Sequence, residues 1–357
     1  MTDKNNNYSW ANFFILDDVV NHSNEVDVAT NEFFRNNPEY AQTIEDYVMV
    51  FRRIMDIVPL TVENIFSGNL FPYLEAEYEL NSAIYFVTKG FYKQAINGLR
   101  SVLELGMLNV YWDIEDNSHI DIQGWLKSKE DTPFRKGIER RLLQNTNIKE
   151  FDSRMEYFNQ VGDVYKKLSN YTHTKGAGYS SRALSPSNFN TFSEKSLKFW
   201  VSSLQKVIRL VMIIHILKYP IAYQHTPIDE KFGLNGPAGG FLNPYQVEMV
   251  KKIFDNETNT LLQQISDKDP IAKSAAEWVN SKPDITEEEL EQQAIEHDKS
   301  YIPNLVGGFP KWLEDQKKML NWYKKDNNQE ALEKHKTHIA VITEWAKKEG
   351  LVGTDTT

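Results

Sequence analysis

The stretch GFYKQAINGLRSVLELGMLNVYWD, residues 90–113, decides the fold class of this chain. From Leu99 to Trp112 it is apolar on nearly every face of a helix, which is typical of a helix buried at the centre of a bundle. It nevertheless carries Arg100 and Glu104, four residues apart on one side of that helix. Because a buried charge has to be paired, these two side chains are expected to have polar partners.

Two interpretations of the Arg100–Glu104 pair follow. The first is structural: an ion pair within the helix that also anchors neighbouring backbone. Against it, a glutamate placed four residues before the basic residue is the more favourable order, and the order here is reversed. The second interpretation is that both side chains face a cleft and belong to a functional site.

Helical periodicity extends outward from this stretch over most of the chain. Apolar residues recur at spacings of three and four, as in Tyr47, Val50, Phe51, Ile54 and Ile57, and sustained alternation of period two is hard to find. The sequence therefore predicts an all-α protein. Helices are expected near residues 8–21, 38–58, 72–88, 91–113, 133–144, 149–173, 190–218, 244–266, 270–280, 286–298, 309–324 and 328–348.

Composition limits the chemistry that the chain can perform. Its 357 residues leave room for one large or two moderate domains, and 41% hydrophobic with 12% aromatic residues exclude a disordered protein. The absence of cysteine excludes disulfides, thiolate metal sites and cysteine nucleophiles. Any catalysis must come from histidine, carboxylates, hydroxyls, lysine or arginine.

Charge and hydropathy narrow the class further. A formal net charge of −10 argues against a protein that coats nucleic acid, because electrostatic attraction to the phosphates needs a basic surface. It still permits a local basic cleft. Two basic clusters exist, and each fits either such a cleft or a solvated helix face. They are Arg135, Lys136, Arg140 and Arg141, and Lys166, Lys167 and Lys175.

The sequence predicts a cytoplasmic protein without a membrane segment. The first residues lack a basic region followed by an apolar stretch, and no window offers about 18 uninterrupted apolar residues. The most apolar stretch, VIRLVMIIHILKYPIAY, carries Arg209, His215 and Lys218, which indicates a buried helix. His215 is expected there as a hydrogen-bonded core residue.

A glycine-rich loop gives the clearest break in the helical pattern. KFGLNGPAGGFLNPYQ, residues 231–246, contains four glycines and two prolines, and Asn243, Pro244 and Gln246 match a capped helix start. The glycines lack the preceding strand and the spacing of a phosphate loop, so a structural role is expected. The predicted domains are residues 1–74 as N-terminal helices packing on the bundle, 75–235 as the bundle, and 236–357 as a C-terminal helical subdomain. The core of that subdomain is expected to contain Trp278, Trp312, Trp322 and Trp345.

The stretch YKKLSNYTHTKG, residues 165–176, is the second constellation of interest. On a continued helix, Lys166, Ser169 and His173 share nearly one face, with Asn170 three residues before His173. A histidine beside a hydroxyl, an amide and ammonium groups can act as a general acid or base on a phosphodiester. The alternative is a plain helix end, in which His and Lys complement the dipole and Gly176 terminates the helix.

Together, the two stretches resemble a known family. An apolar helix with Arg-x-x-x-Glu, followed some tens of residues later by Tyr-x-x-Leu-Ser-x-Tyr-x-His, is similar to the helical HEPN-type domains of bacterial abortive-infection, toxin and defence proteins. The resemblance covers roughly residues 75–218. It implies a four- or five-helix bundle that often dimerises and, in active members, a metal-independent ribonuclease.

The resemblance also implies roles for individual residues. His173 matches the histidine of an Arg-x(4–6)-His motif, which helps the RNA 2′-hydroxyl attack the neighbouring phosphate or protonates the leaving oxygen. Where the motif has arginine, this chain has Lys167 or Lys166, and lysine lacks the bidentate fork of arginine. Arg100 is then the expected substitute at the phosphate. The expected site comprises His173 as acid/base, Arg100 as phosphate clamp, Glu104 as orienting carboxylate, and Ser169, Asn170 and Lys167 as a polar wall.

The expected function is that of a defence- or toxin-type protein acting on RNA as a metal-independent endoribonuclease. Homo-oligomerisation and a protein partner or antitoxin are expected, and no cofactor or metal. The alternative is a non-catalytic helical module for dimerisation or partner binding. His335 and His338 lie one turn apart and suit a metal, but no clear third ligand follows and lysines flank them, so a surface helix is favoured.

Overall fold

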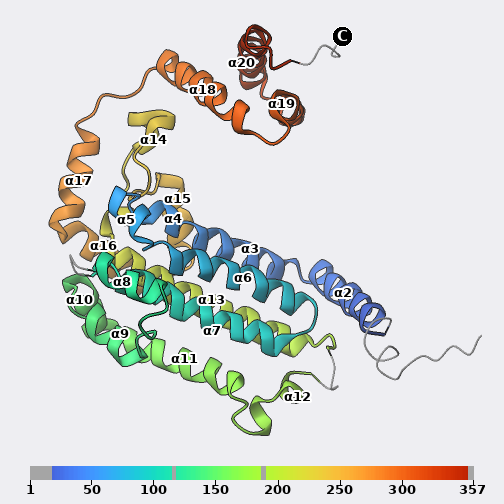
Figure 1. Cartoon of the computed structure of the whole chain (residues 1–357), viewed down its shortest axis with the longest axis vertical. Helices are drawn as coiled ribbons and strands as arrows, with labels where there is room; N and C mark the ends of the chain where they lie inside the picture. The colour runs from blue at the N-terminus through green and yellow to red at the C-terminus, as the bar shows by residue number, and fades with distance from the viewer. Residues whose placement is uncertain (1–17, 115–117, 186–189, 353–357) are drawn as a thin grey trace, which may run out of the picture. The chain divides into compact units, whose positions relative to one another are not determined.

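The computed structural model describes residues 18–114, 118–185 and 190–352, and every regular element in that part of the chain is a helix (Figure 1). The predicted all-α class is therefore confirmed. Two compact units are present. The larger contains the described residues up to Thr226 together with Ala238–Glu277, and the smaller contains Pro227–Pro237 and the described residues from Trp278 onward.

The first helices of the larger unit form the bundle that carries the candidate site. They are α2 (Asp18–Asn36), α3 (Pro38–Arg52), α4 (Ile54–Ile57), α5 (Val62–Ser67), α6 (Phe71–Thr88), α7 (Tyr92–Tyr111), α8 (Ser118–Leu126), α9 (Arg135–Leu142), α10 (Thr146–Met155), α11 (Tyr157–Thr172), η2 (Ala177–Tyr179), α12 (Ser181–Leu184), α13 (Glu194–Lys218) and η3 (Pro220–Tyr223).

The remaining helices follow the first pass through the bundle. The larger unit also contains α15 (Pro244–Lys251) and α16 (Asn256–Lys268). The smaller unit contains α14 (Ile228–Phe232), η4 (Gly233–Asn235), α18 (Glu287–Tyr301), η5 (Ile302–Asn304), α19 (Gly308–Lys325) and α20 (Gln329–Lys348). Helix α17 (Pro270–Asn280) begins in the larger unit and ends in the smaller one.

Helix α7 is the centre of the larger unit, as its apolar sequence predicts. It packs against α6, α11 and α13, and Figure 1 shows α6 and α11 on opposite sides of it. Two glycines permit the close approach. A Cβ at Gly98 would lie 2.8 Å from the Cβ of Ala83 on α6, and one at Gly106 would lie 2.6 Å from Val211 on α13. The helix axes are therefore held close by residues without side chains.

Several helix bounds differ from those expected. The helix expected over residues 149–173 is divided into α10 and α11, because Glu156 between them adopts a left-handed conformation with φ 49°. The helix expected over 244–266 is α15 and α16, and that over 38–58 is α3 and α4. Helices α5 and α8 and most of α2 were not expected. Residues 8–17 of the helix expected over 8–21 lie outside the described part.

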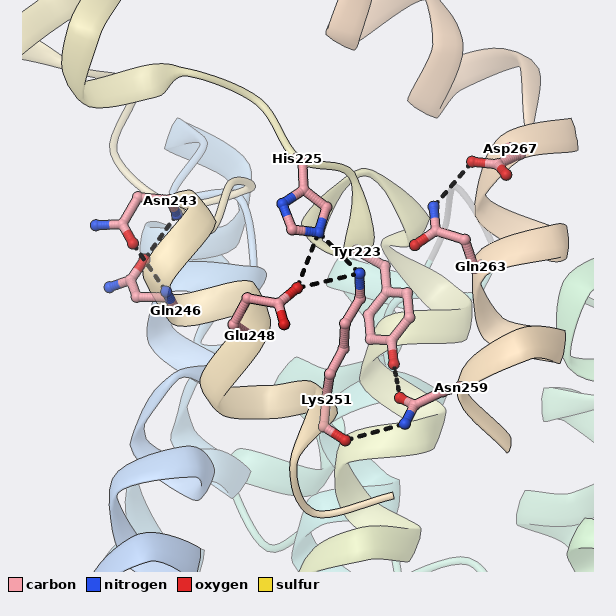
Figure 2. Close-up of polar contacts among 9 residues, drawn as sticks. All are labelled: Tyr223, His225, Asn243, Gln246, Glu248, Lys251, Asn259, Gln263 and Asp267. Carbon is pink, nitrogen blue, oxygen red and sulfur yellow. Dashed lines mark hydrogen bonds and ion pairs between the residues drawn. The ribbon is translucent and has the colours of Figure 1, made fainter. Parts of the chain in front are cut away.

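The division of the chain also differs from the expected boundaries at 74 and 235. Residue 74 lies within α6, and one hydrophobic core extends from Phe33 to Ile265. Helices α15 and α16 belong to the larger unit because α16 packs on η3 and α13. Figure 2 shows part of this attachment: the Tyr223 hydroxyl donates to Asn259 Oδ1, and Asn259 Nδ2 donates to the Lys251 carbonyl at 3.0 Å.

The glycine-rich loop has a structural role in the larger unit. The Leu60 N–H donates to the Ala238 carbonyl at 2.9 Å, and Gly239 has φ +71° with its Cβ position only 2.2 Å from the Val58 carbonyl oxygen. No side chain fits there. The expected capping box at Asn243 is present, since its side chain accepts from the Gln246 N–H and Gln246 accepts from the Asn243 N–H (Figure 2).

The smaller unit has its own core of Ile302, Phe309, Trp312, Ile342 and Ala346. Of the tryptophans expected in that core, Trp312 is buried and Trp345 packs against it, whereas Trp278 and Trp322 are 45% and 55% exposed. The tryptophan-bearing core is therefore only partly as expected.

Helix α13 is, among the described residues, the one helix whose length and composition would suffice to cross a membrane. Of its most apolar window, 78% is buried inside the structure, as in the core helix of a bundle.

Candidate functional site

Arg100 joins α7 to α11. Its Nε donates to the Ser169 hydroxyl at 3.1 Å, and one terminal nitrogen donates to Glu104 Oε1 and to the Tyr165 hydroxyl, both at 2.8 Å. The guanidinium carbon also lies 5.0 Å from the centroid of the Tyr165 ring. The Arg100 and Glu104 side chains are 22% and 33% exposed, so the pair is half-buried and not sealed in the core. Each interpretation of the sequence is therefore met in part: Arg100 and Glu104 form an ion pair within the helix, and both side chains are partly exposed.

These contacts belong to a longer polar seam between α7 and α11. The Thr172 hydroxyl donates to Asn97 Oδ1 at 3.0 Å, and Lys93 Nζ donates to the Thr174 hydroxyl at 2.5 Å. Partner numbers rise along α11 as they fall along α7, so the helices are antiparallel. The seam therefore runs from Arg100 to the C-terminal end of α11, where His173 lies.

A basic cleft of about 1080 Å³ lies between α9 and α11. Ser169 is the link to the seam, because it lines this cleft and also accepts from Arg100. The cleft is defined by its main charged and polar lining residues. These are Arg135, Lys136, Glu139 and Arg140 on α9, Asn159, Asp163, Tyr165, Lys166, Ser169 and Asn170 on α11, and Glu156 between α10 and α11.

The cations of the basic cleft are mostly available to a ligand. Arg135 pairs with Glu139 at 3.5 Å, but Lys136, Arg140 and Lys166 are exposed and form no ion pair among the described residues. Glu156 and Asp163 add negative charge toward the first turns of α11, away from Ser169 and Asn170. Lys166 lies on the later turns of α11, on the side away from these two carboxylates.

A small cavity of about 30 Å³ adjoins the basic cleft and shares Arg135 and Tyr165 with it. Glu104 lines this cavity among apolar side chains such as Leu103 and Met107. The space is that of about one water molecule. Glu104 is thus placed beneath the cleft, where it fixes Arg100 and does not face a large ligand.

His173 lies at the end of α11, outside the lining of the basic cleft. It caps the helix with φ −88°, its residue is exposed, and no hydrogen bond or ion pair of its imidazole occurs among the described residues. Its helical register places it one turn after Ser169, about 6 Å along the axis. The structure therefore does not join His173 to Arg100 or Glu104 by hydrogen bonds, as the expected site required.

Lys167 does not belong to the wall in which it was expected. It lies two residues before Ser169, on the other side of α11, and its Nζ is 4.6 Å from the centroid of the Phe199 ring on α13. Partial burial, together with the Lys206 ammonium, lowers the pKa of Lys167. Ser169 and Asn170, the other two residues of that expected wall, line the basic cleft.

Two features of the candidate site were not predicted from the sequence. Tyr165 is one turn before Ser169 and bonds Arg100, a role that its spacing on the same helix face could have indicated. The basic cluster of α9 was recognised, but nothing in the sequence placed α9 beside α11. That contact depends on tertiary packing.

Two further histidines, His215 and His338, have partners within the protein. His215 is fully buried, with Nδ1 2.7 Å from the Val211 carbonyl and Nε2 2.9 Å from Asn109 Oδ1, which confirms the expected core role. His338 Nε2 lies 2.7 Å from Asp298 Oδ2. Among the residues described, no group of three or more His, Asp or Glu side chains is arranged to hold a metal ion.

Comparisons with protein-family models, with curated proteins and with solved structures found no match to this chain.

Proposed function

We propose that this protein is a HEPN-like, defence- or toxin-type protein that cleaves RNA without a metal, using His173 as acid or base. The observation that carries the proposal is the basic cleft, whose lining residue Ser169 is held by Arg100 and lies one turn before His173 on the same helix face. Packing of α6, α11 and α13 on the central helix α7 supports the bundle that the resemblance implies.

In this proposal the RNA backbone follows α11 along the basic cleft. Lys136, Arg140 and Lys166 contact successive phosphates, and Asn170 donates to a phosphate or sugar oxygen near the open end of the cleft. A strand leaving that end passes His173, which lies exposed on the next turn.

His173 then acts as the general base or acid of cleavage. As a base it removes the 2′-hydroxyl proton while O2′ bonds to phosphorus, the P–O5′ bond breaks, and O5′ receives a proton. The products are a 2′,3′-cyclic phosphate and a 5′-hydroxyl. This step balances without a metal or an added nucleophile, and acid–base catalysis of this kind contributes about 10²–10⁴-fold.

Arg100 has a different role from the phosphate clamp expected from the sequence. Its guanidinium already bonds Glu104, Tyr165 and Ser169, so it fixes α11 and the Ser169 hydroxyl beside the cleft. We assign it as a positioning residue, and Lys166, Lys136 and Arg140 as the phosphate contacts.

Binding and cleavage of a fluorescent single-stranded RNA, measured separately, test this proposal. His173→Ala should bind RNA as the wild type does but cleave it at least about 100-fold more slowly. Lys136→Glu with Arg140→Glu should lose both binding and cleavage. Unchanged RNA binding in the double variant would contradict the role of the cleft.

A non-catalytic interaction module remains the second candidate. The observation in its favour is that Nε and one terminal nitrogen of Arg100 bond residues of the bundle, while His173 is not among the residues that line the cleft. In that case the cleft cations would hold an acidic partner protein. RNA binding without any cleavage by the wild type would favour this candidate.

A further inference from the structure

Asp163 lines the basic cleft although a carboxylate repels the phosphates that the cations of the cleft attract. It is exposed on α11, and its carboxylate forms no hydrogen bond or ion pair among the described residues. Lys166 and Lys167 follow it at three and four residues, within reach on a helix, yet neither pairs with it. Lys167 lies instead against the Phe199 ring. The Asp163 carboxylate is therefore available to a ligand in the cleft.

Asp163 lies between two cations of the cleft. A Cβ at Gly162 would lie only 3.1 Å from Arg135 Nη1, so the Arg135 guanidinium rests on α11 at the residue before Asp163. Its ion pair is with Glu139, at 3.5 Å. Lys166 lies on the following turn, about 4.5 Å further along the helix axis. A nucleotide whose phosphate is held by Lys166 can therefore place its base beside Asp163.

Asn159 supplies a second functional group in this part of the cleft. It lies four residues before Asp163 on the same face of α11, and both side chains are exposed in the lining. Its Nδ2 donates to Glu156 Oε2 at 3.3 Å, which uses one of the two hydrogens of the amide. The two residues thus present an N–H donor next to a carboxylate with two acceptor oxygens.

This order of groups complements the Watson–Crick edge of guanine. Guanine presents O6 as an acceptor followed by N1–H and N2–H as adjacent donors, so an amide can donate to O6 while a carboxylate accepts from N1 and N2. Cytosine, adenine and uracil each carry one N–H group on that edge, so they leave one carboxylate oxygen without a partner. Unpaired bases of single-stranded RNA expose this edge to proteins.

We propose that Asn159 and Asp163 form a guanine subsite, so that the protein selects single-stranded RNA with a guanine bound beside the first turns of α11. The inference rests on the proposed function, because it takes the basic cleft as the RNA site. Asp163 lies ten residues before His173, about 15 Å along the helix axis, so the bound guanine is not the nucleotide that is cleaved. Cleavage is expected at a constant number of nucleotides from that guanine.

Equilibrium binding of labelled RNA to the full chain tests the subsite. The probes are a short oligouridine and the same strand with one central guanosine, compared by fluorescence anisotropy. The wild type should bind the guanosine strand at least about tenfold more tightly, in the range of one good bidentate base contact. Asp163→Ala should abolish this preference. Its affinity for oligouridine should not fall, because the substitution removes a negative charge from the cleft.

Glu139→Ala is the matched control, since it removes a carboxylate of the same cleft that is already paired with Arg135. It should change the affinity for both strands alike and keep the preference for guanosine. Inosine in place of guanosine lacks the N2 amino group, so the wild type should bind that strand at least about fivefold more weakly than the guanosine strand. Asp163→Ala should bind the inosine and guanosine strands equally.

The possible results distinguish the subsite from the proposed function. Equal binding of all strands by the wild type, or a preference for guanosine that persists in Asp163→Ala, overturns the guanine subsite and leaves RNA binding in the cleft. Absence of RNA binding by the wild type overturns the proposed function, and the subsite with it. The inosine comparison uses the wild type alone, so it decides the question whether or not a variant folds.

Discussion

At the residue scale, Arg100 connects two helices through three side chains. Glu104 lies on its own helix, whereas Ser169 and Tyr165 lie on α11, so the guanidinium forms a joint across the α7–α11 contact. Its fork of donors suits this better than a lysine ammonium would, because several acceptors are met in a fixed geometry.

We therefore predict that Ser169→Ala lowers the unfolding free energy by about 1 kcal/mol, the usual value of one hydrogen bond. Arg100→Met should cost about 2 kcal/mol, since it also removes the partner of a half-buried Glu104. Urea unfolding of both variants and of the double variant measures the coupling. Additive effects would contradict the joint, and Lys167→Met is the control without such bonds.

His215 carries the clearest pH effect. Complete burial lowers the pKa of His215 to about 4, below its ordinary value of 6.5, although the hydrogen bond to the Val211 carbonyl favours the charged form. The imidazole is therefore neutral near pH 7. Both its nitrogens nevertheless face oxygen acceptors, on Val211 and Asn109, and a neutral ring can donate to only one of them.

We predict that the larger unit loses stability as the pH falls from about 6.5 to about 4. In the unfolded chain His215 binds a proton below about pH 6.5, whereas in the folded chain it stays neutral down to about pH 4. The unfolding free energy therefore falls by up to about 3 kcal/mol over this range. Urea unfolding across this pH range measures the effect. A His215→Gln variant with the same pH slope as the wild type would assign that slope to other groups.

At the element scale, the helix bounds and caps that depend on neighbouring residues could be predicted from the sequence. Features that depend on tertiary packing could not. The capped start of α15 and the bounds of α6, α7 and α20 depend on neighbouring residues and on apolar spacing. The break between α10 and α11 could not be predicted, because Glu156 is not a residue that favours a left-handed conformation.

The same limit applies to the candidate site. The two motifs contain Arg100 and Ser169, which bond each other, but the expected convergence of Arg100 and Glu104 with His173 does not occur through hydrogen bonds. The face of α11 that Lys167 occupies, and the position of α9 beside Lys166, depend on how the helices pack. The local patterns of a single sequence do not specify how helices pack against one another.

Gly98 tests the close packing of α6 on α7. We predict that Gly98→Ala lowers the unfolding free energy by about 1–3 kcal/mol, because the new Cβ would lie 2.8 Å from Ala83 Cβ and 3.1 Å from the Glu79 carbonyl oxygen. Gly137→Ala on α9 is the matched control. No atom lies within 4 Å of its Cβ position, so helix propensity should make it neutral or stabilising by up to about 1 kcal/mol. Equal destabilisation by both would contradict the packing argument.

At the scale of the whole molecule, a net charge of −10 has to be reconciled with the proposed binding of RNA, which is a polyanion. The negative net charge repels RNA, so in the proposed function the attraction comes from Lys136, Arg140 and Lys166, which line the basic cleft and have no ion pair among the described residues. Binding should therefore be local and strongly dependent on salt.

We predict that log K for single-stranded RNA falls with log salt concentration with a slope of about −2, at about 0.7 for each phosphate contact. Lys136→Gln with Arg140→Gln should reduce the slope to about −0.7. Fluorescence anisotropy at several salt concentrations measures it. As a control, Lys324→Gln with Lys325→Gln on α19 should leave the slope unchanged, and an equal loss in both pairs would contradict a local site.

The central claim is that His173 cleaves RNA bound along α11 without a metal. Its most direct measurement is the rate of RNA cleavage by purified protein in EDTA, with the ends of the products identified. We predict 2′,3′-cyclic phosphate ends from the wild type and a rate at least about 100-fold lower for folded His173→Ala. Intact RNA with the wild type, or equal cleavage by the two proteins, would contradict it.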